Sequence, residues 1–151
     1  MAENRLHIAA SPRDVFAVLA DADAYAEWVI GAKKIRASDP DWPSVGSRFY
    51  HSVGVGPAAI DDSTEVLACE PGRVLDLETR FRPAGVARVV LTLEADGAAT
   101  RVTMREQAVR GPARAAWGVM LNALTHVRNT WSLRRLRRVV RRRSGVFTGG
   151  R

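Results

Sequence analysis

The sequence lacks most of the residues that mark disulfide-bonded and membrane-spanning proteins. It has one cysteine, Cys69, which cannot close an internal disulfide, so the fold must hold by packing and a reducing compartment suits it. No stretch approaches the roughly 20 consecutive apolar residues that a membrane-spanning helix requires, and the first residues contain no uninterrupted apolar run. We therefore expect a soluble, cytoplasmic protein.

Motifs for metals, nucleotides and activated serines are also missing. The three histidines, at positions 7, 51 and 126, have no metal-ligand spacing, so no metal site is predicted. The glycines of segment 54–57 precede no helix, which favours a turn over a phosphate-binding loop. Neither a Rossmann glycine pattern nor a nucleophile-elbow serine occurs. We expect no cofactor and no serine-hydrolase chemistry.

The positive charge is concentrated near the end of the chain. The net charge is +7, and the segment from Arg134 to Arg143 accounts for all of it with seven arginines and no acid. Nucleic-acid binding would require base-stacking aromatics or a groove-reading element near these arginines, but no aromatic follows Trp131 until Phe147. Nucleic-acid binding through this run is therefore the least favoured of three functions, and no nucleic-acid partner is expected. Docking of the segment on an anionic membrane or an acyl carrier protein stays open, as does the oligomeric state.

The content of hydrophobic residues, 46%, is sufficient for one sizeable core. We predict a single domain over residues 1–143 and a disordered tail over residues 144–151. Alternating apolar residues predict a first strand over residues 5–8. The capping residue Ser11 and the proline after it predict a helix that ends near Leu19.

The middle of the chain has the pattern of an antiparallel meander. A second short helix is plausible over residues 23–29, and a loop is predicted over residues 38–46. Strand-like runs separated by glycine and proline turns occur at residues 47–53, 62–69, 73–81, 86–95 and 99–108. The turns are too short for crossover helices, so neighbouring strands should be antiparallel.

A long helix is predicted over residues 113–142, after Gly111 and Pro112. It is the only element long enough to cover the buried face of the sheet, which gives an α+β fold. A curved sheet bends further than one helix can fill, so we expect an apolar pocket between them. Of the helix's two apolar stripes, we expect the one from Trp117 to Trp131 to cover this pocket, although both stripes could instead complete the core.

These features resemble a known superfamily. The element order and the segments ASPRDVFAVLADADAYAEWV, WPSVGSRF, TEVLACEPGRVLDLETR and GAATRVTMREQAVRGP are similar to those of the SRPBCC superfamily, whose fold is called helix-grip or START-like. Within it the likeness is greatest to bacterial proteins of the polyketide cyclase/dehydrase or lipid-transport type. The resemblance covers residues 4–142 and implies a hydrophobic ligand, but the superfamily includes both binding proteins and enzymes.

Strand parity suggests two residues for chemistry. Glu106 shares the inward parity of Val102 and Met104, and His51 shares that of Phe49. A carboxylate and a histidine facing one cavity could move protons. The alternatives are that Glu106 pairs with an arginine such as Arg128, and that His51 is a satisfied core residue.

Parity and helical spacing also predict a set of ligand-binding residues, although each could be a core residue instead. The predicted set is Trp28, Phe49, Val53, Leu77, Thr79, Phe81, Leu91, Met104, Trp117, Met120 and Leu124. Two functions follow. The first is binding of a polyketide, lipid or aromatic metabolite, and the alternative is a polyketide aromatase/cyclase or dehydratase that uses His51 and Glu106 for proton transfer.

Overall fold

The computed structural model describes residues 1–30, 32–53, 57, 60–81, 83, 85–116 and 118–144, without the side chains of residues 33 and 53. Four predictions therefore lie wholly or mostly outside the described residues. They concern Trp117, the side chain of Val53, the turn at 54–57 and the tail after Ser144.

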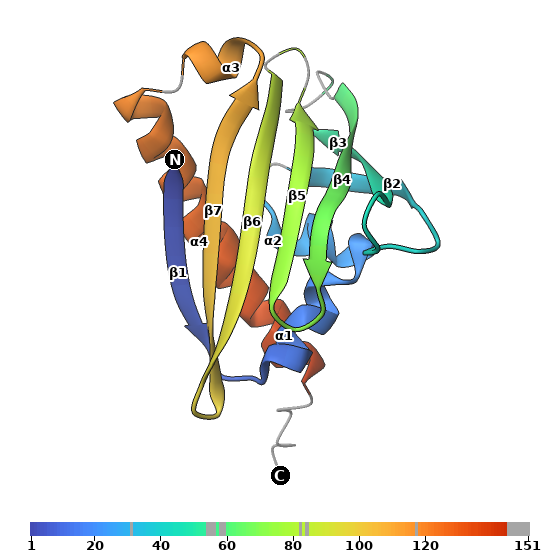
Figure 1. The fold of residues 1–151 in the computed structure, drawn as a ribbon, viewed down its shortest axis with the longest axis vertical. Helices are drawn as coiled ribbons and strands as arrows, with labels where there is room; N and C mark the ends of the chain where they lie inside the picture. Colours follow the sequence, from blue (N-terminus) through green and yellow to red (C-terminus); the bar gives the residue numbers. More distant parts are fainter. Residues whose placement is uncertain are drawn as a thin grey trace.

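The described strands form one antiparallel sheet of seven strands, in the order β1-β7-β6-β5-β4-β3-β2 (Figure 1). Their bounds are β1 Ala2–Ile8, β2 Ala32–Ser38, β3 Arg48–Val53, β4 Ile60–Glu70, β5 Val74–Phe81, β6 Gly85–Asp96 and β7 Ala99–Arg110. Strands β2 to β7 pair in chain order, and β1 pairs with the free side of β7. The predicted meander is confirmed.

Most of the helices lie on one face of this sheet, whereas the short helix that follows β7 lies beyond the end of that strand (Figure 1). The helices are α1 Pro12–Leu19, the single 3-10 turn η1 Ala22–Ala24, α2 Tyr25–Trp28, α3 Pro112–Ala115 and α4 Val119–Arg143. As the sequence predicts, Ser11 caps α1, with its hydroxyl accepting a hydrogen bond from the Asp14 amide at 3.2 Å. The α+β helix-grip architecture is confirmed.

Two elements differ from the prediction. Strand β2 was not predicted, because its sequence AKKIRAS has only one large apolar residue, Ile35, and two bulges disturb its pairing with β3. The long helix is not continuous from residue 113: α3 ends at Ala115, and Gly118 with an extended backbone precedes α4. The helix that crosses the sheet therefore begins at Val119. None of the described helices is long and apolar enough to cross a membrane.

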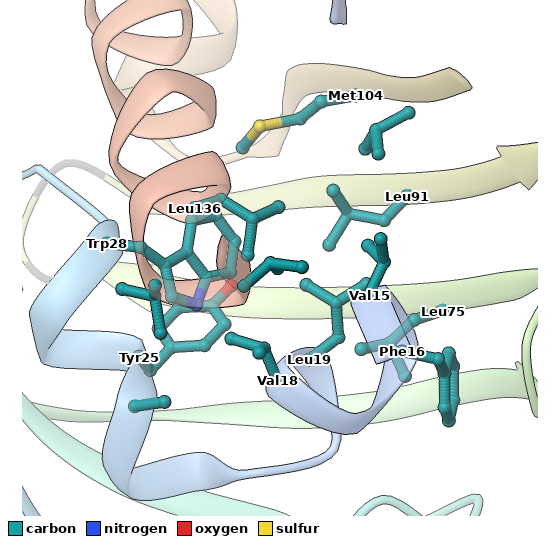
Figure 2. Packing of buried hydrophobic residues seen from close by; sticks show 14 of the residues in the cluster. Val15, Phe16, Val18, Leu19, Tyr25, Trp28, Leu75, Leu91, Met104 and Leu136 are labelled. Carbon is teal, nitrogen blue, oxygen red and sulfur yellow. The ribbon is translucent and has the colours of Figure 1, made fainter. Parts of the chain in front are cut away.

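The core fills one half of the space between the helices and the sheet. Figure 2 shows how its side chains pack there. Leu136 of α4, Trp28 of α2 and Leu19 of α1 are buried there against Leu75 and Leu91 of the sheet. Phe49 adds an aromatic cluster, with its ring centroid 4.6 Å from that of Tyr25 and 4.7 Å from that of Trp42. Contacts of this kind stabilise a fold by about 25 cal/mol per Å² of apolar surface buried.

Candidate functional site

A cavity of about 500 Å³ lies in the other half of this space. Its walls come from α2, the connection to β2, the strands β2 to β7, and the helices α3 and α4. The lining residues are Tyr25, Val29, Ile30, Ala32, His51, Thr64, Thr79, Phe81, Ala87, Glu106, Pro112, Ala113, Ala116, Leu121, Thr125 and Arg128. Most of the surface that these residues offer is apolar.

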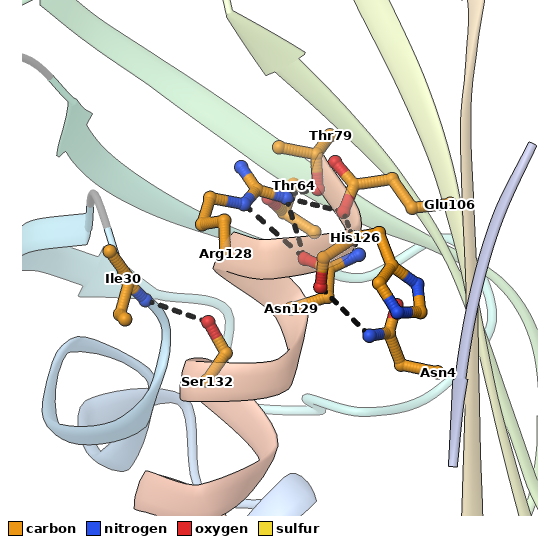
Figure 3. A network of polar contacts seen from close by, with 9 residues as sticks. All are labelled: Asn4, Ile30, Thr64, Thr79, Glu106, His126, Arg128, Asn129 and Ser132. Carbon is orange, nitrogen blue, oxygen red and sulfur yellow. Dashed lines mark hydrogen bonds and ion pairs between the residues drawn. The ribbon is translucent and has the colours of Figure 1, made fainter. Parts of the chain in front are cut away.

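A cluster of polar side chains joins β7 to α4 at the wall of the cavity (Figure 3). One oxygen of Glu106, Oε2, accepts hydrogen bonds from Nη2 of Arg128 and, at 3.0 Å, from Nδ2 of Asn129. Arg128 also donates to Oδ1 of Asn129, from Nε at 3.3 Å and from Nη2 at 3.0 Å. Because Glu106 and Asn129 are buried, the cluster compensates the cost of removing the carboxylate from water.

A second polar group lies on the strands β3, β4 and β5. Nε2 of His51 is 3.1 Å from the hydroxyl of Thr64, which is 3.1 Å from the hydroxyl of Thr79. Burial lowers the pKa of His51 below its ordinary value, although a hydrogen bond to the Ser63 backbone and the charge of Asp62 act against this shift. His51 is therefore neutral at pH 7.

His51 and Glu106 thus line the same cavity, but within the described residues no hydrogen bond joins them. Each has its own partners: His51 contacts the threonines, and Glu106 contacts α4. The pairing of Glu106 with Arg128, one of the two alternatives open from the sequence, is the arrangement in the structure.

Tyr25 is a lining residue that the sequence did not single out. It is buried on α2, and burial together with the charge of Glu106 raises the pKa of its phenol, so it is protonated at neutral pH. Because α2 has only four residues, helical periodicity could not show which way Tyr25 points. Thr64 and Thr125 were missed for a related reason, since a threonine does not stand out in a pattern of apolar residues.

Several residues predicted to bind ligand lie elsewhere. Thr79 and Phe81 line the cavity, as predicted. Five other residues of the predicted set do not line it and are buried in the core: Trp28, Phe49, Leu77, Leu91 and Met104. The structure also corrects the expectation for α4, because Met120 is 77% exposed and Leu124 is 61% exposed. The residues of this helix that face the cavity are Leu121, Thr125 and Arg128.

The orientation of α4 has a physical cause in its polar residues. Its inward face carries Asn129, which bonds Glu106, and Ser132, whose hydroxyl accepts a hydrogen bond from the Ile30 amide at 3.1 Å (Figure 3). Asn4 of β1 donates to the His126 carbonyl at 2.8 Å. These bonds hold a partly polar face against the sheet and leave the apolar stripe outside. Among the described residues, no cluster of side chains suits a metal ion.

Comparison with known proteins agrees with this architecture. The family model described as "Polyketide cyclase / dehydrase and lipid transport" matches residues 2–141. A search of the curated proteins found no match.

Solved structures with low sequence identity have the same fold. A conserved protein from Geobacillus kaustophilus superposes with a TM-score of 0.73 at 17% identity, covering 93% of this chain and 94% of that chain. The di-domain ARO/CYC StfQ from the steffimycin biosynthetic pathway gives 0.71 at 15% identity, covering 95% and 51%. A STAR-related lipid transfer protein from Xanthomonas axonopodis gives 0.71 at 19% identity, covering 92% and 84%.

Proposed function

This chain belongs to the polyketide cyclase/dehydrase and lipid transport family, and we propose that it binds a mainly apolar small molecule, such as a polyketide, lipid or aromatic metabolite, in the cavity between its sheet and α4. The observation that supports this function is the cavity itself. A space of about 500 Å³ is within the range of small-molecule sites and far larger than the voids left by ordinary packing.

The lining is suited to an apolar ligand with few polar groups. Phe81, Leu121 and Val29 offer apolar contact, and affinity comes mainly from burial at about 25 cal/mol per Å². Apart from Tyr25 and Thr125, the polar side chains of the described lining belong to the Glu106 cluster or to the His51–Thr64–Thr79 chain, so they can orient a ligand at two points.

Filling the cavity tests this function. Ala87 is buried on β6 and lines the cavity, so Ala87→Phe places a ring where the ligand would lie. Ala95→Phe, on the same strand but exposed, is the matched control. With acetylnaphthalene as a fluorescent probe, we expect binding to wild type and to Ala95→Phe, and at least about tenfold weaker binding to Ala87→Phe. Equal binding to all three proteins would contradict a site in this cavity.

A second candidate, cyclisation or dehydration of a polyketide chain, is favoured by one observation: His51 and Glu106 line the same cavity. In this function His51, neutral at pH 7, accepts a proton while Glu106 orients the chain. Turnover of a poly-β-ketone substrate should then be lost in both His51→Ala and Glu106→Gln, while probe binding persists. Undiminished conversion by these variants would remove the two residues from any catalytic role.

We also propose that the exposed face of α4 docks on an anionic membrane surface. Met120, Leu124, Val127 and Trp131 are exposed at a spacing of three or four residues, which places them on one side of the helix. The same spacing continues through Arg135, Arg138 and Arg142, all exposed. The guanidinium of Arg134 lies 5.1 Å above the ring of Trp131, where the apolar part meets the basic part.

An apolar row continued by arginines complements a membrane with anionic headgroups, because the apolar side chains can enter the interface while the cations meet phosphate. An acidic carrier protein would match only the basic half of this face. The membrane is therefore the occupant that uses the whole face.

A further inference from the structure

Two of the described residues that line the cavity are charged, and their charges cancel. Among the described lining residues, Glu106 and Arg128 are the only ones with a full charge, since His51 is neutral. They form an ion pair at the junction of β7 and α4. Where these two described residues meet, a ligand in the cavity therefore finds a polar wall with no net charge.

The pair is only partly satisfied by its protein partners. Glu106 uses Oε2 for both of its hydrogen bonds, and Arg128 uses Nε and Nη2 for all of its own. Within the part of the chain that the structure describes, Oε1 of Glu106 and Nη1 of Arg128 make no hydrogen bond (Figure 3). Each of these two lining residues thus keeps an atom free for a ligand, Oε1 of Glu106 as an acceptor and Nη1 of Arg128 as a donor.

We propose that this end of the cavity selects an uncharged ligand bearing a carbonyl or hydroxyl oxygen and rejects the corresponding carboxylate, a specificity that rests on the proposed ligand-binding function. A carbonyl oxygen accepts a hydrogen bond from Nη1 of Arg128, and a hydroxyl also donates to Oε1 of Glu106. When a ligand of this class binds, Glu106 and Arg128 remain paired with each other.

A carboxylate is disfavoured at the same place for two reasons. It brings a second negative charge beside Glu106, in surroundings where charges are screened less than in water. It also competes with Glu106 for Arg128, and whichever carboxylate loses that competition is left buried without a compensating cation. Ionised fatty acids and aromatic acids should therefore bind weakly, whereas ketones, alcohols and uncharged polyketides should bind well.

Two probes of nearly equal size test this selection: acetylnaphthalene, a ketone, and naphthoate, a carboxylate, substituted at the same ring position. Both are titrated by fluorescence against folded wild-type protein at neutral pH. We expect the ketone to bind at least about tenfold more tightly than the carboxylate.

The decisive variant is Glu106→Gln, which leaves Arg128 as the only charged side chain among the described lining residues. This variant should gain affinity for naphthoate and reverse the preference. Glu78→Gln is the matched control, because it removes a carboxylate that pairs with Arg110 and does not line the cavity, and so it changes the net charge equally. It should keep the wild-type preference. The double variant Glu106→Gln/Arg128→Gln restores a neutral end and should again favour the ketone.

Each result has a distinct meaning. A wild-type protein that binds naphthoate as tightly as the ketone, or a Glu106→Gln variant with unchanged preference, overturns the selection and leaves the proposed function standing, provided that Ala87→Phe weakens both probes. Wild-type protein that binds neither probe contradicts the proposed function and the selection together. Circular dichroism of every variant shows that a lost affinity does not reflect a lost fold.

Discussion

The two halves of the space between sheet and α4 are built on the same strands, yet one is filled and the other hollow. On β5 the inward residues change from Leu75 and Leu77 to Thr79. On β6 they change from Leu91 to Ala87. The elements continue without interruption, and what changes is the size and polarity of the side chains directed between the layers.

The same change occurs on the other two elements that face this space. On β7 the filled half has Met104 and the hollow half Glu106, and on α4 the filled half has Leu136 and the hollow half Thr125. The cavity in this fold therefore arises because four elements carry smaller or polar residues at their inward positions in the same region. A smaller residue on one element alone would leave only a small void.

The largest expected difference between the regions is in stability. Leu136→Ala removes a fully buried side chain from the filled half and should cost about 2–5 kcal/mol of the free energy of unfolding. Leu124→Ala makes the same substitution on the exposed face of the same helix and should cost less than about 0.5 kcal/mol. Urea denaturation of the two variants measures both values, and similar losses would contradict the orientation assigned to α4.

A second prediction concerns the polar boundary of the cavity. Asn129 is fully buried and bonds both Glu106 and Arg128, so Asn129→Ala leaves both with one partner fewer and should cost about 1–3 kcal/mol. Asn122 lies two turns earlier on α4, and its Oδ1 is buried without a hydrogen bond among the described residues. Asn122→Ala should therefore cost much less. A larger loss for Asn122→Ala would show that the cluster does little to hold α4.

The sequence predicts those elements in which apolar and polar residues alternate regularly or in which turn residues mark the ends. The meander and the inward parity of β7 could be predicted, because turns with glycine and proline separate strands whose apolar residues alternate. Strand β2 could not be predicted, since a single large apolar residue among seven gives no clear alternation. The break between α3 and α4 could not be predicted either, because the sequence after Gly111-Pro112 is typical of one continuous helix.

The cavity was predicted, but the face of α4 that lines it was not. Hydrophobicity alone assigned the stripe of Met120 and Leu124 to the inside, whereas the structure buries Asn129 and Ser132. Those polar residues have partners on β7 and at Ile30, which only the folded chain brings near. A polar residue is buried at low cost when its partner is in place, and a single sequence does not show the partner.

Acid should weaken the cavity wall through His51. Burial lowers the pKa of the His51 imidazole in the folded protein below 6.5, its ordinary value in an unfolded chain. At a pH between the folded-state and unfolded-state pKa values, the unfolded chain therefore binds the proton more readily than the folded chain. Stability therefore falls as the pH drops through 6.5 and toward the lower, folded-state pKa. His51→Gln has no imidazole to protonate and should lose less stability than wild type between about pH 7.5 and pH 5.5. Equal losses in urea denaturation would contradict a buried neutral histidine.

The smallest effect on stability is expected on the outer face of α4, where the arginines of the basic segment are not equivalent. Arg143 pairs with Asp21 at 2.8 Å and with Glu27 at 3.7 Å, so its replacement would also remove these two ion pairs. Arg135, Arg138 and Arg142 are exposed on the side that continues from Trp131. Replacing these three by Gln should change the free energy of unfolding by less than about 0.5 kcal/mol each.

The same triple variant should strongly reduce binding to phosphatidylglycerol vesicles, because each arginine near an anionic surface contributes about 1 kcal/mol. A control that replaces Arg5, Arg73 and Arg101 by Gln removes the same charge from positions outside α4 and should bind vesicles nearly as well as wild type.

If both triple variants lose vesicle binding equally, net charge alone drives the binding. If the α4 variant binds vesicles normally but loses an acidic carrier protein, the carrier is the partner. Loss of vesicle binding in the α4 variant alone would place the membrane contact on the helix that also covers the cavity.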